Sequence, residues 1–179
     1  MDKDFIHRIL LSAAQEVFST MLGMQAELCE AAAPLETSPD GQERVVALIG
    51  VAGNYIGTGM IGCSPALACK AASTMMMNEY PGVDSEVLDA IGEISNMIFG
   101  NVKTALEAQV GPLGLSIPTV VFGRNFTTRS IGTQPWITLP LNIESEGLDL
   151  RFCIVANTAM PRPIRHGFKR EYALADVQD

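Results

Sequence analysis

The hydrophobic residues of the chain follow two different spacings. Over residues 4–22 and 84–108 they recur every three or four positions, which is the spacing of an amphipathic helix. A stretch of extended character follows Gly23. Apolar runs typical of β-strands occupy residues 44–53, 55–63, 115–123, 135–143 and 148–157.

Boundary residues mark one more helix. Ser64-Pro65 supplies a capping hydroxyl followed by proline at the first helical position, and Pro81-Gly82 stops the helix over 65–80. The resulting order is helix, three strands, two helices, three strands. This order indicates an α+β fold, with the helices packed on an antiparallel sheet, and contains a faint internal repeat of a helix followed by strands.

Capping and turn residues set the other boundaries. Asp2 or Asp4 can cap the first helix, and Asp84 or Ser85 can open the long one. Turns are predicted at residues 37–42, at Gly53-Asn54 and at Glu146-Gly147.

The long helix carries polar residues opposite its apolar stripe. At about 100° per residue, the stripe consists of Val87, Ile91, Ile94, Ile98, Val102 and Ala105. The opposite ridge consists of Asp89, Glu93, Asn96, Gly100 and Glu107. Each glycine weakens a helix by about 1 kcal/mol relative to alanine, and a solvated face does not need one. We therefore predict a docking surface here, flanked by Met97, although a solvated helix face fits the same pattern.

Composition and charge narrow the class of protein. With 47% hydrophobic and 18% charged residues, the chain fits one compact domain over 1–158, followed by a proline-broken tail over 159–179. The net charge of −8 argues against a nucleic-acid partner, because phosphate binding depends on clustered Lys and Arg. No apolar run approaches the roughly 18 residues of a membrane span, and the N-terminus lacks a signal-peptide pattern. We expect a soluble, cytoplasmic protein with no membrane partner.

Cysteine and histidine do not suggest a metal site or a nucleophilic triad. The four cysteines form no CxxC pair, and the two histidines, His7 and His166, stand at opposite ends of the chain. We expect the cysteines to be buried small hydrophobes and the chain to hold no metal ion.

A sequence signature lies within the long helix. Residues 89–106, "DAIGEISNMIFGNVKTAL", contain Asp89-x3-Glu93-x2-Asn96, and "SIPTVVFG" follows at 116–123. This combination resembles the signature of the CheC/CheX/FliY family of response-regulator phosphatases. The resemblance covers about residues 4–157 and includes "EVFSTMLGM" at the end of the first helix. Between Asn96 and Pro118 there are 21 intervening residues, one fewer than the family spacing. Pro118 is therefore not included among the predicted site residues.

The resemblance implies a phosphatase that hydrolyses the aspartyl phosphate of a CheY-type receiver domain. Asn96 would orient the attacking water, because a carboxamide can accept from a water proton while it donates elsewhere. Glu93 would pair with the receiver's active-site lysine, while Asp89, Met97 and Gly100 contact the partner. Mg²⁺ would be held by the receiver, so this chain would bind no cofactor. The resemblance also implies a homodimer formed by pairing of sheet edges.

The first helix repeats the spacing with one change. Ser12-x3-Glu16-x2-Ser19 has serine where the amide should be, and a hydroxyl lacks the fixed donor and acceptor of a carboxamide. Two-site members of the family carry a site on each long helix. We predict a degenerate first site and one working site, as in CheX-like members; a chance match is the alternative.

Two other functions stay open. The first is a non-catalytic receiver-binding or flagellar-switch module that docks without hydrolysis. The second is nucleotide binding, because "GTGMIG" over Gly57–Gly62 fits GxGxxG. The following helix begins only after Ser64-Pro65, too late to cradle a pyrophosphate, so a close-packed strand or a subunit contact is the favoured interpretation of these glycines.

Overall fold

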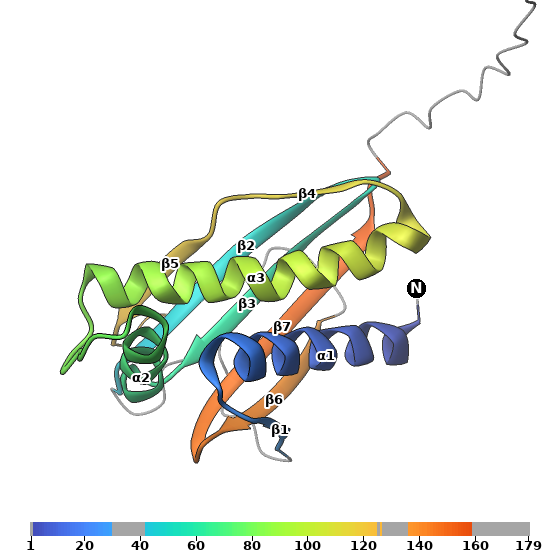
Figure 1. Cartoon of the computed structure of the whole chain (residues 1–179). Coiled ribbons are helices and arrows are strands. Elements are labelled where there is room, and N and C mark those ends of the chain that lie inside the picture. Colours follow the sequence, from blue (N-terminus) through green and yellow to red (C-terminus); the bar gives the residue numbers. More distant parts are fainter. Residues whose placement is uncertain (1, 30–41, 125, 127–135, 159–179) are drawn as a thin grey trace, which may run out of the picture.

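The computed structural model describes residues 2–29, 42–124, 126 and 136–158. Within these ranges, three helices lie on one face of a seven-stranded antiparallel sheet (Figure 1). The predicted α+β class is confirmed. No helix in these ranges is long and apolar enough to span a membrane. The elements are α1 (Lys3–Leu22), β1 (Ala26–Leu28), β2 (Arg44–Gly53), β3 (Tyr55–Cys63), α2 (Pro65–Met76), α3 (Ser85–Val110), β4 (Leu113–Leu115), β5 (Thr119–Gly123), β6 (Ile137–Ile143) and β7 (Glu146–Ala156).

The sheet has the strand order β1-β6-β7-β3-β2-β4, and β5 also pairs with β2. β4 pairs with Val51–Gly53 and β5 with Arg44–Leu48, so both lie along the same edge of β2. The single strand predicted over 115–123 is therefore wrong, because the chain leaves the ladder at Ser116 and Pro118 has no N–H to donate. Four strands follow the two central helices instead of three.

Two predicted segments cannot be compared with the structure. Of the predicted turn at 37–42, only residue 42 is among the described residues, and the tail at 159–179 lies wholly outside them.

Two other boundaries differ from the predictions. The β6–β7 turn is formed by Glu144 and Ser145, both at positive φ (47° and 75°), and not by Glu146-Gly147. Two consecutive residues at positive φ suit the right-handed twist of a hairpin, which explains the position. α2 ends at Met76, with Met77 in the left-handed conformation, so the helix stops before Pro81-Gly82. The turn at Gly53-Asn54 is confirmed.

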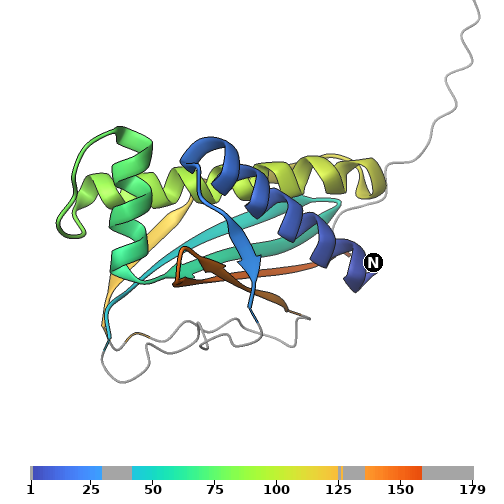
Figure 2. The ribbon, with the colours of Figure 1, turned by 60° about the horizontal axis from the view of Figure 1, so that its bottom comes forward.

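α3 begins at Ser85 because the Asp84 carboxylate caps it, accepting a hydrogen bond from Val87 N at 3.0 Å. Figure 2 shows α1 and α3 on the same side of the sheet, diverging toward the end of α3. This divergence explains why Ala105, predicted in the buried stripe, is exposed. The other five predicted stripe residues are buried, and the full buried set is Val87, Ala90, Ile91, Gly92, Ile94, Ser95, Ile98, Phe99, Val102 and Leu106.

Close packing of the Phe99 side chain against Gly59 brings α3 into contact with the sheet. Gly59 lies in the central strand β3, and a Cβ placed there would lie 2.5 Å from the Phe99 ring. Phe99 in turn stacks on Phe152 of β7, with ring centroids 5.9 Å apart. Gly57–Gly62 therefore lies within a central strand, and α2 begins only at Pro65, so these glycines do not form the strand-to-helix loop of a nucleotide-binding fingerprint.

We expect Gly59→Ala to lower the free energy of unfolding by about 1–3 kcal/mol, because the added methyl group overpacks the Phe99 contact. Chemical denaturation measures this change. Gly100→Ala is the matched control, since a Cβ at Gly100 meets nothing within 4 Å and should leave stability equal or higher. Equal stability of Gly59→Ala and the wild type would contradict this description of how α3 is seated.

Candidate functional site

The predicted ridge faces outward along α3. Asp89 and Glu93 are exposed, and Asn96 and Gly100 are half-buried, while the opposite face of the helix is packed on the sheet. The residues are three or four positions apart, so their side chains leave the helix on one side. The structure therefore brings the acid and the amide together on the surface, as the sequence predicts.

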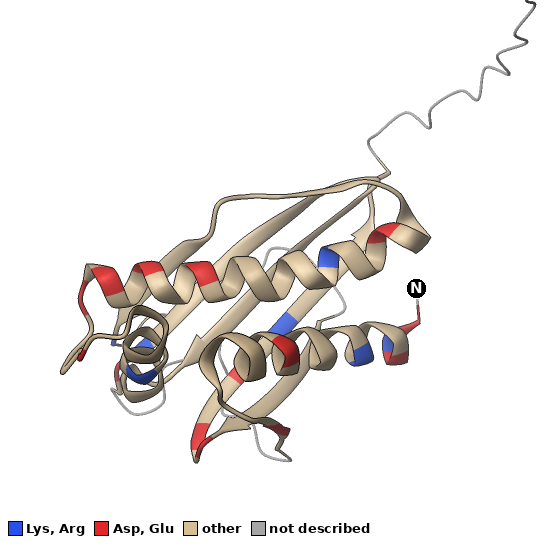
Figure 3. Cartoon of the chain, viewed as in Figure 1, with Lys and Arg blue, Asp and Glu red and all other residues tan. Residues whose placement is uncertain are grey.

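Negative charge gathers on the first half of α3 (Figure 3). Asp84, Glu86, Asp89 and Glu93 precede the first basic residue of the helix, Lys103. Asp84 is occupied as the cap, and Glu86 accepts a hydrogen bond from the Tyr80 hydroxyl, which raises the Tyr80 pKa. Within the described residues, the side chains of Asp89 and Glu93 make no hydrogen bond or ion pair. Both are therefore available to a cationic group on a partner.

Glu107, the last residue of the predicted ridge, is occupied by contacts within the chain. Glu107 accepts a hydrogen bond from Leu113 N at 2.8 Å and pairs with Lys103 at 2.9 Å. The backbone hydrogen bond from Leu113, together with Lys103, lowers the Glu107 pKa. Glu107 therefore fastens β4 to α3, and its carboxylate is not free for a partner.

Asn96 and Met97 lie on different flanks of the ridge. The Asn96 carboxamide makes no side-chain hydrogen bond to a described residue, so its donor and acceptor are both available. Met97 is half-buried and packs against the core, so only part of its side chain is accessible beside the ridge. Gly100 leaves open space above the helix, because no atom lies within 4 Å of a Cβ placed there.

Pro118, which is not among the predicted site residues, lies against this site. A Cβ placed at Gly92 would lie 3.5 Å from the Pro118 ring, so the proline packs on α3 one turn before Asn96. Ser116 N donates to Gly50 O at 2.9 Å, and Gly50 N donates to Ser116 Oγ at 2.8 Å. The segment Ser116–Pro118, here named the strap, is thus held between β2 and α3. The proline of the family signature was the signal that could have identified it.

Two of the α1 residues that match the spacing of the α3 ridge make contacts within the chain. Ser12, Glu16 and Ser19 are all exposed on α1. Asn101 Nδ2 of α3 donates to Glu16 Oε2 at 3.3 Å, and Ser19 Oγ donates to the Glu16 carbonyl at 3.3 Å. Glu16 therefore contacts the neighbouring helix, and the residue three positions after it on α1 is Ser19, which has no carboxamide. The prediction of a degenerate first site is consistent with this geometry and stays a prediction.

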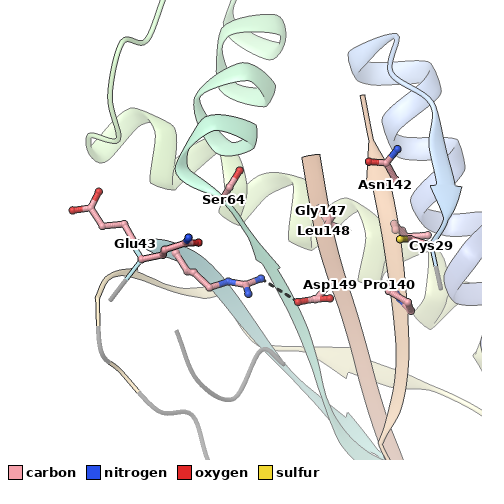
Figure 4. A pocket seen from close by; sticks show the side chains of 11 residues that line it. Cys29, Glu43, Ser64, Pro140, Asn142, Gly147, Leu148 and Asp149 are labelled. Carbon is pink, nitrogen blue, oxygen red and sulfur yellow. Dashed lines mark hydrogen bonds and ion pairs between the residues drawn. The ribbon is translucent and has the colours of Figure 1, made fainter. Parts of the chain in front are cut away.

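A cavity of about 320 Å³ opens away from the ridge, between the starts of β2 and α2 and the β6–β7 hairpin (Figure 4). Arg44 and Asp149 form a buried ion pair in its wall, with Nη2 and Oδ2 3.0 Å apart. Burial raises the Asp149 pKa and the Arg44 charge opposes that shift. None of the predicted site residues lines this cavity. Among the described residues, no group of three or more His, Cys, Asp or Glu side chains is placed to hold a metal ion.

Comparison with known proteins identifies relatives of this chain. A family model described as chemotaxis phosphatase CheX matches residues 45–142, more than half of the chain, including all of α3. The CheY-P phosphatase CheX of Thermotoga maritima is 35% identical over 103 residues, which cover 57% of this chain and 65% of that protein. This chain thus matches slightly less than two thirds of that relative's length.

Solved structures share the fold. The chemotaxis protein CheX from Vibrio vulnificus has a TM-score of 0.72 at 24% identity, covering 87% of this chain and 99% of that chain. A CheX-CheY-BeF3-Mg²⁺ complex from Borrelia burgdorferi matches with a TM-score of 0.63 at 23% identity, covering 82% of this chain and 96% of that chain. By the extent of the family match, this chain belongs to the chemotaxis phosphatase CheX family.

Proposed function

We propose that this chain hydrolyses the aspartyl phosphate of a CheY-type receiver domain, with the outer ridge of α3 docked at the phosphorylated pocket. The observation that carries the proposal is the projection of Glu93 and Asn96 from one face of α3, with neither side chain paired. Two comparisons support it: the Thermotoga maritima relative is named a CheY-P phosphatase, and the Borrelia burgdorferi structure is a complex of CheX with CheY.

Asn96 positions the water in this proposal. Hydrolysis requires an oxygen in line with the bond from phosphorus to the aspartyl leaving group, so positioning supplies much of the rate enhancement. The Asn96 carbonyl oxygen accepts a hydrogen bond from the attacking water while its amide donates to a neighbouring acceptor. The water oxygen bonds to phosphorus, the bond from phosphorus to the aspartyl oxygen breaks, and the products are inorganic phosphate and the free carboxylate.

Glu93 and Asp89 set the register of the complex. Glu93 lies one turn before Asn96, where its carboxylate pairs with the receiver's active-site lysine through a charge-assisted hydrogen bond. Asp89 contacts the edge of the same pocket. Mg²⁺ is held by the receiver's acidic residues, so this chain supplies no metal ligand, and phosphate release is its catalytic output. A homodimer remains our prediction for the assembly.

Loss of phosphate from a phosphorylated receiver tests the proposal. We expect the purified chain, at substoichiometric concentration and with Mg²⁺, to accelerate release of inorganic phosphate well beyond the receiver's own rate. The assay is run with receivers encoded beside this chain. If the chain binds a beryllofluoride-activated receiver and phosphate release stays at the receiver's own rate, the non-catalytic binding module is the correct function.

Gly100→Leu tests whether the ridge is a close interface. A Cβ at Gly100 meets open space, so the variant should fold with stability equal to or above that of the wild type, because leucine is the better helix former. The larger side chain should nevertheless hold the receiver away and raise KM by about tenfold or more. Steady-state kinetics and a thermal melt measure the two effects. A receiver KM equal to that of the wild type would show that Gly100 lies outside the contact.

A further inference from the structure

Ile117, in the middle of the strap, is an exposed apolar residue in a fixed position. Its side chain is 87% exposed. Ser116 on one side is bonded twice to Gly50 of β2, and Pro118 on the other side packs at Gly92 of α3. Ser116 Oγ also donates to the Ile117 carbonyl at 2.8 Å. The backbone around Ile117 is thus held on both sides while its apolar side chain stays in water.

The strap adjoins the flank of the ridge on which Asn96 lies. Gly92, the residue that Pro118 contacts, precedes Asn96 by four positions, which places Asn96 one turn on and only about 40° around the helix. Glu93 lies about 100° around the helix from Gly92, so it projects in a direction farther from that of Gly92 than Asn96 does. A partner that reaches the Asn96 carboxamide from outside must also come close to the strap.

The two parts of this surface supply different kinds of interaction. The ridge presents the unpaired carboxylates of Asp89 and Glu93, which favour a cationic group and set orientation. The strap presents an apolar side chain whose backbone is already ordered, so binding loses little conformational entropy there. Binding energy in protein interfaces concentrates in such apolar anchors next to polar contacts.

We propose that Ile117 is an apolar anchor for the receiver domain, packing on an apolar patch beside the phosphorylated pocket when the α3 ridge engages that pocket. This inference rests on the proposed function. It adds a residue outside α3 to the contact, and it assigns to the strap the role of holding the partner while α3 performs the chemistry.

Ile117→Ser tests the anchor. The variant should keep the wild-type melting temperature, because a largely exposed side chain contributes little to stability. We expect KM for the phosphorylated receiver to rise about tenfold with kcat unchanged, since the anchor binds ground state and transition state alike. Leu28→Ser is the matched control: Leu28 is 52% exposed on β1, at the opposite edge of the sheet, and its substitution should leave KM unchanged.

Three results would overturn the anchor: an unchanged KM in Ile117→Ser, a fall in kcat alone, or a rise in KM that accompanies conversion of a dimer to a monomer in light scattering. The last result would assign Ile117 to a contact between two copies of this chain. Titration with a beryllofluoride-activated receiver separates this inference from the phosphatase proposal. If the wild type binds without releasing phosphate, the proposed function fails, and a tenfold weaker titration of Ile117→Ser still supports the anchor.

Discussion

Asn96→Ala should lower kcat for receiver dephosphorylation by about a hundredfold or more, because the attacking water loses the group that holds it in line. Affinity for the receiver should change by less than about threefold, since alanine removes only one polar contact at the ridge. Single-turnover phosphate release at saturating enzyme gives the chemical step, and titration with the beryllofluoride-activated receiver gives the affinity.

Asn101→Ala provides the matched control for this variant. It makes the same substitution five residues farther along α3, on the flank that faces α1, where Asn101 contacts Glu16. We expect wild-type kcat and KM from it. A turnover number for Asn96→Ala equal to that of Asn101→Ala would remove Asn96 from the mechanism. A thermal melt checks that the half-buried position 96 tolerates alanine.

Glu93→Ala should damage both binding and turnover. Removing one partner of a charge-assisted hydrogen bond costs about 1.5–3 kcal/mol, which corresponds to roughly a 10- to 150-fold weaker complex. The register of Asn96 at the phosphoryl group is also lost, so kcat should fall as well. Steady-state kinetics over a range of receiver concentrations separates the two effects.

Ionic strength gives the Glu93 prediction a second readout. Binding of the wild type should weaken as salt rises, because the contact joins opposite charges, and binding of Glu93→Ala should respond less. Glu27→Ala removes an exposed glutamate from β1, at the far edge of the sheet, and should keep the wild-type salt response. A salt response that is identical in all three proteins would contradict a charge pair at Glu93.

The outward placement of the site could be predicted because helical periodicity constrains it strongly. Once Val87, Ile91, Ile94 and Ile98 face the sheet, Glu93 must face away from it, whatever the rest of the fold. The exposure of Ala105 could not be predicted, since it depends on the divergence of α1 and α3, which is a property of the packed structure.

The position of the strap also depends on tertiary packing, so the sequence did not predict it. A run such as "LSIPTVVFG" has the composition of one strand, and its division into β4 and β5 follows from where Ser116 bonds to Gly50 and Pro118 packs at Gly92. Both contacts join residues far apart in sequence, so a local pattern cannot reveal them. The same limit applies to Glu107, whose bond to Leu113 N depends on the course of the chain after α3.

The structure of a complex between this chain, a beryllofluoride-activated receiver and Mg²⁺ tests the central claim most directly. We predict that the outer ridge of α3 faces the activated aspartate, with the Asn96 carboxamide within hydrogen-bond distance of the in-line water position and Glu93 paired with the receiver lysine. A complex in which the receiver binds another face, with Asn96 and Glu93 left in solvent, would contradict the account.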